Sequence, residues 1–116
     1  MTDPAKERDL LRIYIGERDK HDVKPLYHAI VELFRTNHFL GATVLRGIMG
    51  FGASSKLHTD KFDVLSLDMP IIIECVERAE KIDAILPELD RMVGGGLILR
   101  QKVELIAHRP AQPTGS

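Results

Sequence analysis

The order in which strand-like and helix-like segments follow one another restricts the fold of this chain more than any other feature. Between Leu10 and Ile15, apolar residues alternate along the chain, which predicts a strand. From Pro25, apolar residues recur every three or four positions as far as Phe34. This spacing is typical of an amphipathic helix, and we expect the helix to end near Asn37.

A second helical pattern runs from Arg78 to Val93 and contains Pro87, where we expect a kink because proline removes one backbone hydrogen bond. The other strand-like segments are 42–51, 71–76 and 97–106. The chain therefore has the order βαββαβ. Two right-handed crossovers then predict an α+β, ferredoxin-like fold: a four-stranded antiparallel sheet with two helices on one face.

The predicted sheet has one face without a helix to cover it. Segment 42–51 is rich in Val, Leu, Ile and Met without clean alternation, which is typical of a strand buried on both faces. Because the chain offers no third helix, the simplest cover for this face is another copy of the chain. The pattern therefore predicts oligomerisation, but not the number of copies.

Length and composition limit the classes of protein to consider. A chain of 116 residues has the size of one domain, which we place at 10–107 between a flexible N-terminus (1–9) and a flexible tail (108–116). A net charge of −1 argues against nucleic-acid binding. No apolar run approaches the roughly 20 residues that span a bilayer, so we expect no membrane insertion. One cysteine, Cys75, allows no internal disulfide, and a reducing cytoplasm fits best.

Two glycine-rich segments are candidate ligand loops. In Arg46–Gly52 the glycines are spaced GxxGxG, the reverse of the dinucleotide-binding fingerprint, so they mark either a strand end with a bulge or a ligand loop. Gly94–Gly96 is either a helix stop or a backbone nest for an anion. Such a nest needs a nearby cation. The candidates are Arg46, Arg100, Lys102 and Arg109.

Other residues that could carry chemistry favour ordinary structural roles. The five histidines show no metal-ligand spacing, so we expect no metal. Cys75 lies in the most apolar strand and is expected in the core. Glu74 and Glu77 share no defined face and are expected to face solvent. Hydrolase and phosphoryl-transfer signatures are absent from the sequence, so we expect no enzyme.

The segment from about residue 53 to 68 is long for a connection between strands, and long loops on rigid sheets are often functional. Its middle is polar and could adopt different conformations with and without ligand, as a switch requires. We therefore predict a partner-binding loop. Its candidate contact residues are Ser54, Ser55, Lys56, His58, Asp60 and Lys61.

Several segments together resemble a known family. They are LRIYIGERDKHD (11–22), Pro25–Tyr27, TVLRGIMGFG (43–52), Pro70–Val76 and Gly94–Leu97. The chain resembles the uncharacterised bacterial and archaeal DUF (UPF) proteins grouped as PII-like, which are related to the nitrogen regulatory protein PII. The match covers nearly the whole domain.

The resemblance implies a role as well as a fold. Gly50–Gly52 is similar to the motif that opens the mobile T-loop of PII proteins, so residues 53–68 would be the T-loop. The Gly94–Gly96 turn would be similar to the B-loop, which closes over nucleotide phosphates at clefts between three subunits. The turn departs from PII proteins by lacking their acidic residue and lysine, and an alignment places Ala107 and Arg109 where they carry two arginines.

The leading hypothesis is a cytoplasmic, non-enzymatic, homotrimeric signal-transduction protein. It has no cofactor, binds an adenine-nucleotide-like effector at subunit clefts, and regulates a partner protein, such as a membrane transporter or channel. The implied ligand residues are Arg46, Gly50, Phe51, Gly52, Gly94, Gly95, Gly96, Arg100, Lys102 and Arg109. The alternatives are a regulatory module for amino acids or another small effector, and a ferredoxin-like enzyme such as an acylphosphatase.

Overall fold

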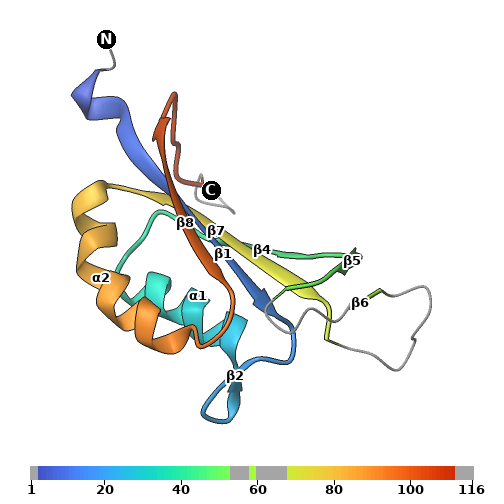
Figure 1. The fold of residues 1–116 in the computed structure, drawn as a ribbon. Helices are drawn as coiled ribbons and strands as arrows, with labels where there is room; N and C mark the ends of the chain where they lie inside the picture. Colours follow the sequence, from blue (N-terminus) through green and yellow to red (C-terminus); the bar gives the residue numbers. More distant parts are fainter. Residues whose placement is uncertain (1–2, 53–57, 60–67, 112–116) are drawn as a thin grey trace, which may run out of the picture.

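The computed structural model describes residues 3–52, 58–59 and 68–111. Its centre is a four-stranded antiparallel sheet in the order β4-β7-β1-β8 (Figure 1). The strands are β1 (Glu7–Gly16), β4 (Thr43–Arg46), β7 (Pro70–Glu77) and β8 (Leu97–Glu104). Two helices, α1 (Leu26–Thr36) and α2 (Ala79–Met92), lie on the same face of the sheet. The predicted ferredoxin-like α+β fold is therefore confirmed.

The hydrophobic core lies between this face and the helices. Along β1 and β7 every second residue is buried, which is the strand period expected for a sheet covered on one side. The strands contribute Leu11, Ile13, Ile15, Ile71, Ile73 and Cys75 to the core, and the helices contribute Leu26, Ile30, Leu33, Phe34, Ile82, Ile85 and Leu89. Cys75 is in the core as predicted. Burial and, secondly, the charge of Glu77 raise the pKa of its thiol to about 12.

The opposite face of the sheet, here called the open face, has no covering element among the described residues. The strand register assigns it the apolar or aromatic side chains of Leu10, Tyr14, Leu45, Ile72, Val76, Leu97, Leu99 and Val103, and the polar side chains of Arg8, Arg12, Thr43, Glu74 and Gln101. Apolar side chains outnumber polar ones on this face, and leucines of both edge strands are about half exposed. A sheet with apolar residues on both faces agrees with the sequence pattern, although the described residues cover only one face.

Several predicted element bounds need correction. Of the predicted strand 42–51, only Thr43–Arg46 forms β4. All four residues of β4 are exposed rather than buried on both faces, because β4 is an edge strand beyond the helices. Met49–Gly50 (β5) instead pairs with His58–Thr59 (β6). The last strand ends at Glu104, two residues before the predicted end.

The N-terminal part of the chain is more ordered than its polar sequence predicts. A short 3-10 helix, η1 (Pro4–Lys6), precedes β1, which begins at Glu7 rather than Leu10. The reason is a tertiary contact, because Asp9 is buried and pairs with Arg100 of β8. The connection between β1 and α1 holds a small hairpin made of β2 (Lys20–His21) and β3 (Lys24–Pro25).

The prediction that Glu74 and Glu77 face solvent is wrong for Glu77. Its side chain is buried, and its carboxylate accepts backbone hydrogen bonds from Leu40 and Arg78 at 3.0 and 2.9 Å. These bonds satisfy the buried charge and attach the segment before β4 to the start of α2. Glu74 lies on the open face and is paired with Arg12.

Candidate functional site

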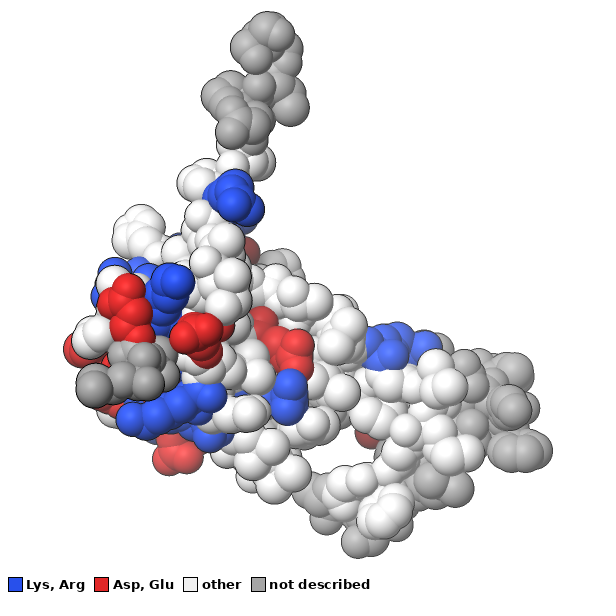
Figure 2. Space-filling model, turned by 90° about the horizontal axis from the view of Figure 1, so that it is seen from above, with Lys and Arg blue, Asp and Glu red and all other residues white. Residues whose placement is uncertain are grey.

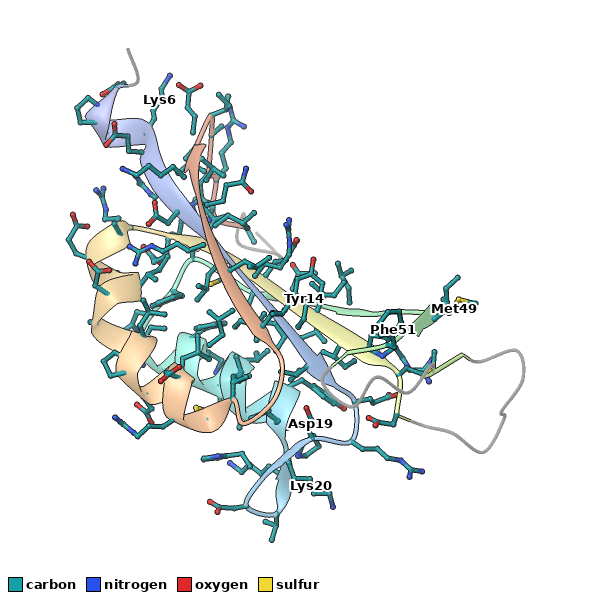
Figure 3. The ribbon with its side chains drawn as sticks, in the orientation of Figure 1. Lys6, Tyr14, Asp19, Lys20, Met49 and Phe51 are labelled. Carbon is teal, nitrogen blue, oxygen red and sulfur yellow. The ribbon has the colours of Figure 1, made fainter. Side chains whose placement is uncertain are left out.

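The turn after β1 contacts the end of β4 and the residues just before β7. On one side, Arg46 Nε donates to Glu17 Oε1 at 2.9 Å. On the other side, Arg18 N donates to Asp68 Oδ1 at 3.0 Å, and Glu17 N donates to the Met69 carbonyl at 2.8 Å. Within the turn, Asp19 Oδ2 accepts a hydrogen bond from Gly16 N at 2.9 Å (Figure 3). The turn therefore holds Arg46, before the predicted loop, and residues 68–69, where the loop ends.

Glycines after β4 let the chain cross close to Pro70. A Cβ atom on Gly50 would lie 2.9 Å from Pro70 Cγ, and one on Gly47 would lie 3.2 Å from Pro70 Cβ. The Gly47 amide donates to the Pro70 carbonyl at 2.7 Å. The structure thus gives these two glycines a packing role at the strand exit. Gly52, in contrast, has open space at its Cβ position.

Apolar side chains project from the same segment. Ile48 and Phe51 are each 72% exposed and Met49 is 54% exposed. Figure 3 places Met49 and Phe51 on the β5 hairpin, away from both helices. Exposed apolar groups beside a cation, Arg46, can contact a ligand that carries both an apolar ring and a negative charge.

The Gly94–Gly96 turn joins α2 to β8. Gly96 has φ +140°, and a Cβ there would lie 2.1 Å from the Tyr14 carbonyl oxygen, so this position requires glycine for the fold. Gly94 and Gly95 are exposed, and a Cβ on Gly94 would meet nothing within 4 Å. The turn therefore combines one structural glycine with accessible backbone.

The two glycine segments lie at the same end of the sheet but at opposite edges. Arg46 pairs in register with Ile71 of β7, whereas Leu97, just after the glycine turn, pairs with Tyr14 of β1. Strands β7 and β1 lie between them (Figure 1), so at about 4.8 Å per strand spacing the edges are roughly 14 Å apart. One chain alone does not bring the segments into contact.

Arg100, a predicted ligand residue, is occupied by its own fold. Its Nε lies 2.5 Å from Asp9 Oδ2 and its Nη1 lies 2.7 Å from Asp83 Oδ1, so it ties together β1, β8 and α2. These hydrogen bonds, to Asp83 first and then Asp9, raise the pKa of the guanidinium. Its place in the fold gives Arg100 a structural role rather than the expected free cation.

The remaining predicted cations lie apart from the glycine turn. Lys102 lines a cleft of about 480 Å³ beside the first residues of α2, together with Arg78 and Glu104. Both cations and carboxylates line this cleft. Arg109 follows β8 and is exposed. The predicted ligand residues therefore lie in four places on one chain: the 46–52 segment, the glycine turn, the cleft lined by Arg100 and Lys102, and Arg109 beyond β8.

The predicted partner-binding residues Ser54, Ser55, Lys56, Asp60 and Lys61 lie outside the described residues. His58 belongs to β6 and so to the small sheet with β5. The pairs Met49 with Thr59 and Gly50 with His58 form this small sheet, which lies beyond the end of β4 (Figure 1).

The charge distribution and side-chain clusters give further limits. On the face seen in Figure 2, acidic and basic side chains lie next to one another, with broad neutral areas between them. Within residues 3–52, 58–59 and 68–111, His, Cys, Asp and Glu form no group of three that could hold a metal ion. Among these residues there is also no helix long and apolar enough to cross a bilayer.

Sequence reasoning missed the ion pairs. Glu17 was not among the predicted site residues, although it holds Arg46, and the Arg12–Glu74 pair on the open face was not foreseen. The sequence does hold a signal for the Arg12–Glu74 pair. Each residue lies at a position of an alternating strand that points away from the buried residues, so both belong to the same face of the sheet. For Glu17–Arg46, which joins residues 29 positions apart, the one-dimensional pattern offers no comparable signal.

The solved structure of CPII bound to ADP and bicarbonate, from Thiomonas intermedia K12, has the same fold. It covers 85% of this chain and 88% of its own, with a TM-score of 0.54 and 14% sequence identity. The architecture is therefore that of a PII-like, ferredoxin-like domain.

Sequence comparison specifies the family. The model of the DUF190 family, described as "Uncharacterized ACR", matches residues 8–105, so this chain belongs to the DUF190 family. A UPF0166 protein of Methanocaldococcus jannaschii is 37% identical over 91 residues, covering 78% of this chain and 83% of the relative. A UPF0166 protein of Aquifex aeolicus is 32% identical over 100 residues, covering 86% and 94%.

Proposed function

We propose that this chain is a non-enzymatic, PII-like signal-transduction protein that works as a homotrimer. A small adenine-nucleotide-like effector binds at clefts between subunits, and its binding changes how the 53–68 loop engages a partner protein. The observation that carries the proposal is the placement of the two glycine segments, at one end of the sheet but on opposite edges. A cleft between adjacent copies is the arrangement that can bring them to one ligand.

The chemistry of the two segments suits such an effector. The exposed backbone at Gly94 and Gly95 offers N–H groups to phosphate oxygens, because no side chain obstructs them. Phe51, which is largely exposed, offers a ring against which a base can stack. Arg46 is paired with Glu17 through Nε, but its side chain is 43% exposed and can still contact an anion. The neighbour CPII was solved with ADP, which supports testing adenine nucleotides first.

The test is a thermal-shift measurement with ADP, ATP and AMP, because a ligand that binds the native state raises the melting temperature. The discriminating variant is Gly94→Asp, which places a carboxylate in the proposed phosphate site. Gly41→Asp is the matched control, since a Cβ at either glycine meets nothing within 4 Å. We expect nucleotides to stabilise the wild type and the Gly41 variant but not the Gly94 variant.

Equal stabilisation of both variants would place the ligand elsewhere. Stabilisation by amino acids and not by nucleotides would replace the proposal with an amino-acid-binding regulatory module.

The partner is proposed to be a membrane transporter or channel, the kind of protein on which PII-type regulators act, and the chain itself stays in the cytoplasm. Deleting residues 54–66 should leave the trimer intact, by sedimentation equilibrium, and abolish partner binding. Loss of the trimer in this variant would make the loop structural instead.

A further inference from the structure

An ion pair lies in the middle of the open face. Arg12 Nε is 2.6 Å from Glu74 Oε2, and the two side chains are 32% and 30% exposed. The two residues are direct cross-strand partners on β1 and β7. The hydrogen bond from Arg12 to Glu74 raises the pKa of the guanidinium, so Arg12 keeps its positive charge.

The surroundings of this pair are apolar on both sides. In the register, the neighbouring row on one side is Tyr14 with Ile72, and the row on the other side is Leu10 with Val76. Leu99 on β8 extends the central row at Arg12, and Thr43 on β4 extends it at Glu74. Two opposite charges therefore lie between two mainly apolar rows, and the other polar residues of the open face, Arg8, Thr43 and Gln101, lie nearer its edges.

This arrangement limits what can cover the open face. Covering the pair removes water from both charges, and the cost of that desolvation can exceed the attraction between them unless further polar groups complete their hydrogen bonds. A purely apolar partner surface would leave the outward-facing oxygens and N–H groups unsatisfied. The occupant must therefore bring hydrogen-bond acceptors to Arg12 and donors to Glu74, and a carboxylate and a cation make the strongest bonds of each kind.

A second copy of this chain meets that requirement, because the same surface carries both groups in equal number. We propose that Arg12 and Glu74 select a second copy as the occupant of the open face, with Arg12 of each chain facing Glu74 of another. The inference rests on the proposed assembly and adds the residues that choose its partner. The apolar rows supply the attraction, and the exchanged charges fix the register and exclude other apolar surfaces.

Charge reversal tests this exchange. Arg12→Glu makes the central pair wholly negative, and Glu74→Arg makes it wholly positive. Sedimentation equilibrium of each variant alone should show a dissociation constant raised at least tenfold over the wild type. Mixing the two variants should restore association in part, in oligomers that contain both chains. In a ring of three, two contacts then join opposite charges and the third joins like charges, so the dissociation constant should fall between those of the single variants and the wild type.

Mixing is the decisive step because it separates contacts between chains from contacts within a chain. If the pair acted only inside one chain, every chain in the mixture would keep its like-charged pair and no assembly would return. The control is Glu32→Arg, a charge reversal on the outer surface of α1, which should assemble like the wild type. Circular dichroism of each variant checks that the monomer is folded.

Two further outcomes distinguish this inference from the assembly on which it rests. A wild-type chain that stays monomeric at every concentration would overturn both. A wild-type oligomer whose two single variants assemble equally well would overturn the role of the ion pair and leave the proposed trimer standing. The double variant Arg12→Met/Glu74→Met should still associate but form oligomers of mixed size.

Discussion

The two faces of the sheet have similar apolar side chains but different surroundings. Along β7, Ile73 and Cys75 are enclosed by α1 and α2, whereas Ile72 and Val76, one residue away, lie on the open face. The difference teaches that apolar content alone does not say how a surface is buried. One face is covered by α1 and α2, and the other has no cover among the described residues, which is where we propose a second copy.

Charged residues are also used differently on the two faces. On the helix-covered face, Glu77 is only 3% exposed and accepts hydrogen bonds from two backbone N–H groups. The fold fixes the positions of these two donors. On the open face, Glu74 is paired with the side chain of Arg12, which can exchange partners by rotation. The first arrangement holds the fold together, and the second leaves a polar contact available to another chain.

The largest difference between the faces should appear on truncating neighbouring isoleucines of β7. Ile73→Ala empties a site that is 0% exposed, so we expect a loss of about 2–5 kcal/mol in the free energy of unfolding, as for other isoleucines in cores. Ile72→Ala removes the same atoms from the open face and should mainly weaken assembly. Denaturant unfolding at several protein concentrations measures both effects.

The concentration dependence is what distinguishes the two variants. The loss for Ile73→Ala should be the same at every concentration, whereas that for Ile72→Ala should grow with concentration as the wild type assembles. Equal, concentration-independent losses would mean that the open face is not an interface.

A smaller contrast is expected between the two glutamates of β7. Glu77→Gln leaves one amide proton facing a backbone N–H, and a buried donor without a partner costs roughly 1–3 kcal/mol. Glu74→Gln removes a charge from a partly exposed pair and should cost the monomer less. Thermal unfolding of both variants measures the difference, and a Glu74 variant that is less stable than the Glu77 variant in dilute solution would contradict it.

Much of the fold could be predicted because periodicity is a local property. The helix expected from Pro25 to near Asn37 is α1, Leu26–Thr36, since the spacing of its apolar residues follows directly from the helical period. The length of β4 could not be predicted in this way. It ends at Arg46 where pairing with β7 ends, and that pairing depends on residues far along the chain.

The candidate site was less predictable for the same physical reason. Residue type indicated that Arg46 and Arg100 are cations, but their partners are set by the tertiary fold: Glu17 for the first, Asp9 and Asp83 for the second. Gly96 was identified as a possible anion-binding glycine. Its close approach to the Tyr14 carbonyl, which requires glycine for steric reasons, becomes visible only once α2 has returned to the sheet.

The smallest expected effect comes from comparing the reactivity of a cysteine thiol at two adjacent positions of β7, one on each face of the sheet. Cys75 should react very slowly with iodoacetamide at pH 8 in the native protein, because its side chain is buried and its pKa, raised to about 12, leaves little of the nucleophilic thiolate. Unfolding should restore ordinary reactivity. Because the folded thiol keeps its proton where an exposed thiol with a pKa of 9.0 loses it, folding stability should also fall as pH rises from about 9 towards 12.

The matching thiol on the open face is introduced by Val76→Cys in a Cys75→Ala background. In dilute solution this thiol should react readily, because its face has no cover within the described chain. Its reaction should slow as protein concentration rises, while the slow labelling of native Cys75 stays independent of concentration. Rapid labelling of native Cys75 would show that the helices do not seal their face. A labelling rate at position 76 that does not change with protein concentration would show that no second copy covers the open face. Assembly depends on protein concentration, whereas the folding of one chain does not.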